Sequence, residues 1–245
     1  MLSGLSLAIK LLLSVLVGAF ISLDYVACAQ LMLSTPLVIS AILGWLLGNF
    51  SLGLSIGIAF QLLWLMDAAV GAHIPPDGSA GAQIATIGIL CFFPRGAVAE
   101  WNLSLAALVA IPFALVSSIT ERWMRRANTH LQDWVINTLE REPKEITRLG
   151  MNRLRLSFLA GIFALFLRSV VVIGLGSGVC YLVLYYTNQW SIPEPLTRGL
   201  GWGWRLLPAV GIGSAVRYFL SKKWEMALTL LGLSAALIAV IFISR

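Results

Sequence analysis

The chain has 245 residues, of which 59% are hydrophobic and only 11% are charged. About a quarter of the residues in a soluble domain are charged, so this composition excludes a soluble enzyme or binding module and predicts an all-α, polytopic membrane protein. The net charge of +6 does not indicate nucleic-acid binding, because eight of the 17 Lys and Arg lie in residues 121–155, as expected for a cytoplasmic loop.

The apolar blocks that predict helices lie near residues 4–23, 35–49, 52–70, 80–94, 103–120, 156–186, 200–220 and 225–244. A membrane span needs about 20 apolar residues, so several blocks are too short to cross a bilayer alone. The first block also resembles a signal-peptide core, followed by Ala27, Cys28 and Ala29 as a cleavage site. Because Lys10 is the only early positive charge and apolar sequence resumes almost at once, we interpret this block as the first membrane helix.

Polar residues and glycines around the second block predict contacts between helices. Asp24 is expected in the headgroup region. Gln30, in an apolar context, is a candidate substrate contact because its amide needs a partner. Pairs of glycines four residues apart predict helix faces that approach closely. These pairs are Gly44 with Gly48 and Gly53 with Gly57.

The stretch 53–88 is the predicted functional site. Gln61 and Asp67 lie in its apolar run, two consecutive prolines then break the helix, and Asp77 follows where it can cap the next helix. A break at membrane depth is tolerated only where it is buried or lines a wet cavity. Gln61, Asp67 and Asp77 are therefore candidate substrate contacts. His73, beside the break, is a further candidate, although a hydrogen-bonding spacer is the simpler interpretation.

Two of these candidates also have structural interpretations. Gln61 can form a hydrogen bond that holds two helices together, and the carboxylate of Asp67 can reach the membrane interface. Helical termini and unwound segments hold polar solutes in transporters, so capping by Asp77 and solute binding are compatible. The stretch thus predicts broken or re-entrant helices around a polar site.

The charged segment 121–155 predicts an amphipathic helix on the membrane surface, with a docking face for a soluble protein as the alternative. Arg168, inside block 156–186, either snorkels or pairs with an intramembrane acid such as Asp67 or Asp77, and pairing is favoured. Three glycines predict a bend in that block. These are Gly174, Gly176 and Gly178.

No catalytic, cofactor or metal site is predicted. The sequence carries no visible Ser-His-Asp or metal-ligand set. Its three cysteines lie in apolar surroundings without ligand spacing, so we interpret them as packing residues. These residues therefore predict no catalytic chemistry of the chain's own.

Two segments resemble the IIC membrane subunit of mannose-type sugar phosphotransferase systems. The first comprises Gly53, Gly57, Gln61, Gly71 and Pro76-Asp77 in their spacing, and the second runs from Arg198-Gly199-Leu200 through Leu207-Pro208-Ala209-Val210-Gly211-Ile212-Gly213. The similarity extends along residues 1–245, which are therefore expected to form a single membrane domain.

The resemblance implies a permease subunit of the bacterial inner membrane, not an enzyme, that binds a hexose or amino sugar near the membrane centre and moves like an elevator. It implies a IID membrane partner, cytosolic IIA and IIB proteins that phosphorylate the sugar, and trimers of IIC–IID pairs. By position, Gln61 and Asp77 would face the sugar. Ala69 stands where mannose-specific members carry asparagine, and Ala29 and Gln30 replace expected acidic residues, which leaves the sugar open.

Two other functions remain open at this stage. A receptor or scaffold would recruit cytosolic proteins through residues 121–155 without moving a solute. An unrelated secondary transporter built from inverted repeats would use the same broken helices.

Overall fold

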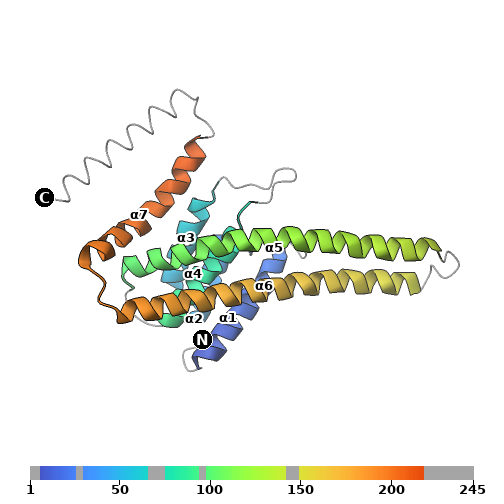
Figure 1. Ribbon diagram of the computed structural model, residues 1–245, viewed down its shortest axis with the longest axis horizontal. Coiled ribbons are helices and arrows are strands. Elements are labelled where there is room, and N and C mark those ends of the chain that lie inside the picture. The colour runs from blue at the N-terminus through green and yellow to red at the C-terminus, as the bar shows by residue number, and fades with distance from the viewer. Residues whose placement is uncertain (1–5, 26–29, 66–74, 94–97, 142–148, 218–245) are drawn as a thin grey trace.

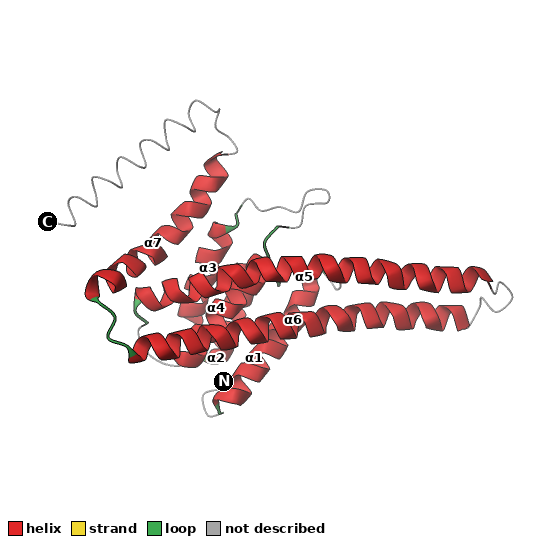
Figure 2. Ribbon diagram, in the orientation of Figure 1, coloured by secondary structure: helices red, strands yellow, loops and turns green. Residues whose placement is uncertain are grey.

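The computed structural model describes residues 6–25, 30–65, 75–93, 98–141 and 149–217, and all regular structure in these ranges is helical. Figures 1 and 2 show the helices and the short loops that join them. In chain order the elements are α1 (Leu7–Ser22), η1 (Leu23–Tyr25), α2 (Pro36–Leu47), α3 (Phe50–Leu63), α4 (Gly78–Phe92), α5 (Glu100–Arg141), α6 (Leu149–Gln189) and α7 (Glu194–Arg217). The all-α prediction is confirmed.

The helices fall into a short and a long class. Helices α1 to α4 are apolar but have only 12 to 16 residues, and 12 residues rise only about 18 Å, well short of a bilayer core of about 30 Å. Among the described residues, two helical segments are long and apolar enough to span a membrane, Glu100–Asp133 and Arg155–Gln189. The short helices fit the expected broken pattern.

Helices α5 and α6 run side by side and extend together beyond the other helices (Figure 1). The span expected to end near Thr120 continues without interruption to Arg141, so the amphipathic segment begins as part of α5. At the three glycines where a bend was expected, α6 is not interrupted and continues to Gln189. A Cβ on Gly176 would lie 2.5 Å from Ile84 Cδ1, so this glycine serves the close approach of α4.

Helices α2 and α3 form a tight pair whose contact is made by glycine. A Cβ on Gly44 would lie 2.8 Å from Gly53 Cα, and one on Gly57 would lie 2.8 Å from the carbonyl oxygen of Pro36. The predicted close packing is confirmed at these three glycines. Gly48 has another role, because it ends α2 with a φ of 92°, a left-handed conformation that glycine adopts without strain.

Helix α4 lies at the centre of the molecule and positions the site. Its residues from Ala80 to Cys91 are all buried, and it packs against α1, α2, α3, α5 and α6. Small side chains allow this crowding, and the Cys180 Sγ would lie 2.5 Å from a Cβ on Gly88. Cys91 and Cys180 are free and buried, as predicted for packing residues, whereas Cys28 lies outside the described residues. The polar start of α4 is thereby fixed inside the helix cluster.

Candidate functional site

The break before α4 is held by hydrogen bonds to α5. Pro75, Pro76 and Asp77 are not helical, as the two prolines predict. The backbone N–H of Asp77 donates to the Ala114 carbonyl at 3.1 Å, and the Ser118 hydroxyl donates to the Pro75 carbonyl at 2.7 Å. These bonds satisfy backbone groups that have no partner within a helix, so the break is a defined structure.

Asp77 caps α4 and also belongs to a charged network. Its Oδ1 accepts a hydrogen bond from the backbone N–H of Ala80 at 3.0 Å, which confirms the predicted cap. Its Oδ2 accepts one from the Ser117 hydroxyl at 2.6 Å and lies 3.8 Å from Arg168 Nη2. The favoured pairing of Arg168 with an intramembrane acid is therefore confirmed, and the acid is Asp77.

Arg168 is itself held by α5. Its Nε donates to Thr120 Oγ1 at 3.0 Å and its Nη2 donates to Ser117 Oγ at 2.5 Å and to the Ser117 carbonyl. The side chain is only 11% exposed, and a buried charge needs a partner and hydrogen bonds. The guanidinium thus ties α6, α5 and the start of α4 together.

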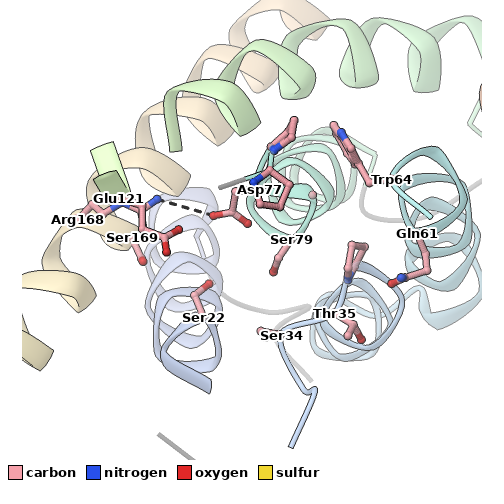
Figure 3. Close-up of a pocket in the computed structure, with 14 residues that line it drawn as sticks. Ser22, Ser34, Thr35, Gln61, Trp64, Asp77, Ser79, Glu121, Arg168 and Ser169 are labelled. Atoms are coloured by element: carbon pink, nitrogen blue, oxygen red, sulfur yellow. Dashed lines mark ion pairs between the residues drawn. The ribbon is translucent and has the colours of Figure 1, made fainter. Parts of the chain in front are cut away.

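A cavity of about 260 Å³ lies between these groups and the ends of α1, α2 and α3. Figure 3 shows Asp77, Arg168 and Glu121 on one side of it and Gln61 and Trp64 on the other. The lining residues are Ser22, Ser34, Thr35, Pro36, Gln61, Trp64, Pro75, Pro76, Asp77, Gly78, Ser79, Glu121, Arg168 and Ser169. Hydroxyl, amide and charged groups from six helices or their flanking residues therefore converge on one space.

Two helix N-termini meet at this cavity. Pro36, the first residue of α2, and Gly78, the first residue of α4, both line it. Helix N-termini carry unpaired N–H groups and a partial positive charge. Gln61 Oε1 approaches the backbone N–H of Leu37 at 3.5 Å, which places the amide against the start of α2. The N-termini favour ligands that carry oxygen acceptors.

The cavity also has an apolar wall and a buried acid. The Trp64 ring lies against the start of α4, where a Cβ on Gly78 would be 2.9 Å from its Cε3 atom. Glu121 is only 3% exposed, and its Oε1 accepts hydrogen bonds from Arg125 Nε at 3.1 Å and Nη2 at 2.6 Å. A neutral solute with several hydroxyls would find donors, acceptors and an apolar ring face here.

The structure brings together only some of the predicted contact residues. Gln61 and Asp77 line the same cavity, whereas Gln30 is exposed, has a φ of 53° and does not line it. Asp67 and His73 lie outside the described residues. Glu121 and Trp64 were not predicted. Their sequence spacing could have identified them. Trp64 follows Gln61 by three residues and Glu121 follows Ser117 by four, which places each pair on one helix face.

Comparisons with known proteins give two matches in sequence. Residues 8–243 match the family model described as "PTS system sorbose-specific iic component". The PTS system sorbose-specific EIIC component of Klebsiella pneumoniae is 23% identical over 206 residues, which cover 82% of this chain and 70% of that protein.

Two solved structures have a similar fold. One, described as a membrane protein, has a TM-score of 0.64 at 16% identity, and the alignment covers 98% of this chain and 95% of that protein's chain. The other, the mannose transporter ManYZ in complex with microcin E492, has a TM-score of 0.56 at 15% identity with the same coverage. At these identities the structures show the shared fold alone.

The family match extends over almost the whole chain, including both segments that carry the resemblance. It decides against an unrelated secondary transporter, because the match is to one family from α1 to beyond α7. The chain belongs to the family of PTS system sorbose-specific IIC components, which are mannose-family membrane components of sugar phosphotransferase systems.

Proposed function

We propose that the cavity at the start of α4 is the sugar site, and that the protein moves a hexose or amino sugar across the bacterial inner membrane. The observation that carries this is the convergence of Asp77, Arg168 and Gln61 on one cavity at a helix break. Its volume of about 260 Å³ is just below the range of about 300–1,000 Å³ typical of drug-sized ligands. It therefore suits a small polar solute such as a monosaccharide.

The chemistry of the cavity supports the proposal of sugar binding. A sugar hydroxyl both donates and accepts hydrogen bonds, so it suits the amide of Gln61 and the free capacity of the serine hydroxyls. The carboxylate of Asp77 adds a strong acceptor, since hydrogen bonds to charged groups are the stronger ones. The ring face of Trp64 offers an apolar surface for the C–H face of a pyranose.

Phosphoryl transfer belongs to partner proteins in this proposal. A IID membrane subunit and cytosolic IIA and IIB proteins fit the family, and trimers of IIC–IID pairs are the expected assembly. Support for a membrane partner comes from α6, whose apolar span is only 22% buried and exposes Phe158 and Phe163, each 64% exposed. Lipid or another apolar membrane protein must cover this face.

The test is sugar affinity in the purified complex with IID, measured by calorimetry for Asp77→Asn and Gln61→Ala. Loss of the charged acceptor is expected to weaken binding about tenfold or more, and loss of the amide about two- to tenfold. The control is Glu194→Gln, which also neutralises an ion-paired acid, but one that is 73% exposed and outside the cavity. Full affinity in both cavity variants would overturn the proposed site.

A further inference from the structure

Gln83 lies outside the cavity and forms hydrogen bonds to two serines that line it. It is fully buried in α4 and does not line the cavity. Its Nε2 donates to the hydroxyl oxygens of Ser22 at 2.9 Å and of Ser79 at 3.2 Å. Both serines line the cavity, so one buried amide contacts two groups that face the ligand.

The hydrogen bonds around Gln83 fit an amide whose nitrogen faces the two serines. The Ser22 hydroxyl donates its hydrogen to the Gly18 carbonyl at 2.9 Å, so its oxygen can accept from Gln83. The structure accordingly places the amide nitrogen of Gln83 toward both serines. The other end, Oε1, is buried without a hydrogen-bond partner among the described residues. It faces Gly18, where a Cβ would collide with it.

Ser79 has unused capacity in this arrangement. Among the described residues its hydroxyl takes part in one hydrogen bond, which it accepts from Gln83. A hydroxyl also has one hydrogen to donate. With its oxygen engaged from behind by the amide, the Ser79 hydroxyl is free to donate toward the cavity that it lines.

We propose that Gln83 is a positioning residue for substrate selectivity: it orients the Ser79 hydroxyl as a donor to one oxygen of the bound sugar. This rests on the proposed function, since it requires the ligand to be a sugar in this cavity. A site that hydrogen-bonds a substrate hydroxyl discriminates against the analogue that lacks it. Gln83 and Ser79 together would therefore make binding depend on one hydroxyl of the sugar.

The experiment measures the affinity of the IIC–IID complex for a hexose and for each of its monodeoxy analogues. Ser79→Ala is expected to weaken binding of the parent sugar about three- to tenfold and to abolish the affinity loss caused by removing one particular hydroxyl. Gln83→Met, which keeps length but removes the donor, is expected to reduce the affinity loss at that same hydroxyl and at no other. Gly18→Ala, which displaces the amide from outside the cavity, is expected to act in the same way.

The matched control is Thr86→Val. Thr86 lies on the same face of α4 as Gln83 and is fully buried, and among the described residues its hydroxyl, like Gln83 Oε1, has no hydrogen-bond partner, but it does not line the cavity. It is expected to leave the ratio between the affinity for the parent hexose and the affinity for each monodeoxy analogue unchanged. Ratios that stay at wild-type values in Gln83→Met and Gly18→Ala would overturn the inference alone. Absence of sugar binding by the wild-type complex would overturn the proposed function and the inference together.

Discussion

Asp24 organises the chain that enters the cavity from α1. It is 6% exposed, and its two carboxylate oxygens accept hydrogen bonds from the backbone N–H groups of Leu31 and Leu33, each at 2.8 Å. The loop so fixed leads directly to Ser34 and Thr35, which line the cavity. Asp24 is thus buried within the fold, and its hydrogen-bond partners are backbone groups of the following loop.

Removing this carboxylate should loosen one wall of the cavity. Asp24→Ala leaves two partly buried N–H groups without their acceptor, at a cost of about 2 kcal/mol, which corresponds to a lower melting temperature by about 4–8 °C. Weaker sugar binding is expected as well. Thermal unfolding and calorimetry on the same sample measure both effects. Asp133→Ala, at an exposed acid of α5, is the control, and equal behaviour of the two variants would contradict the role of Asp24.

The sequence predicts individual site residues only where placing them in a membrane is costly. Asp77 and Arg168 stand out because charges are expensive in a bilayer, and Gln61 stands out as an amide in an apolar run. Glu121 could not be predicted as a cavity residue, because it begins a charged segment and is therefore expected to be solvated. The serines of the cavity were hidden because a hydroxyl is common in membrane helices and only the fold brings them together.

At the scale of elements, the second segment of the resemblance is α7, and its glycine fits against the end of α3. A Cβ on Gly211 would collide with the carbonyl of Leu62 and lie 2.6 Å from the Leu63 Cα. Leu62 follows Gln61 directly, so this contact supports the helix end that carries the amide and Trp64. The glycine-rich sequence thus supports the cavity wall without lining the cavity itself.

A single methyl group should disturb this contact. Gly211→Ala is expected to push α7 from α3 and to cost about 1–3 kcal/mol, as overpacking does. Gly213→Ala adds the same methyl two residues later in the same helix, where a Cβ would meet nothing within 4 Å. It is expected to be neutral or slightly stabilising, since alanine favours helix more than glycine does. Thermal unfolding of the pair measures the difference, and similar melting temperatures would refute the contact.

The sequence predicted which segments are helical better than where the helices end. The short helices α2 and α4 begin at Pro36 and just after Asp77, where a proline and a cap mark their starts. Around Thr120 the composition changes from apolar to charged, but no proline or glycine stops the helix, so α5 continues. A change of pattern along a helix reports a change of surroundings and not an end of the helix.

At the scale of the whole molecule, the length of α5 relates the cavity to the extended helices. Glu121 follows Glu100, the first residue of α5, by 21 positions, and at 1.5 Å per residue this is about 31 Å, close to the thickness of a bilayer core. The cavity therefore lies about one core thickness from the Glu100 end. Glu121 of α5 and Arg168 and Ser169 of α6 line it, and these two helices run side by side in Figure 1.

The composition predicted this molecule as a helical membrane protein, and the positive charges predicted which end faces the cytosol. The position of the cavity relative to that end could not be predicted, because it depends on which residues of α5 and α6 lie beside α4. Those neighbours are set by packing, such as the contact of Gly176 with Ile84, and such contacts leave no regular pattern in the sequence.

The cavity is expected to bind the sugar, whereas the basic residues of α5 beside it are expected to dock the protein that phosphorylates the sugar. Arg122 and Arg126 are exposed just beyond the buried Glu121, where a cytosolic phosphocarrier would approach a sugar leaving the cavity. Reversing both charges, R122E with R126E, should reduce phosphorylation-coupled uptake about tenfold or more, because charge complementarity speeds association by at least this factor. The affinity for sugar should stay at the wild-type value. Arg198→Glu, at an exposed arginine of α7 outside the cavity, is the control, and unchanged uptake in the double variant would exclude docking at this end.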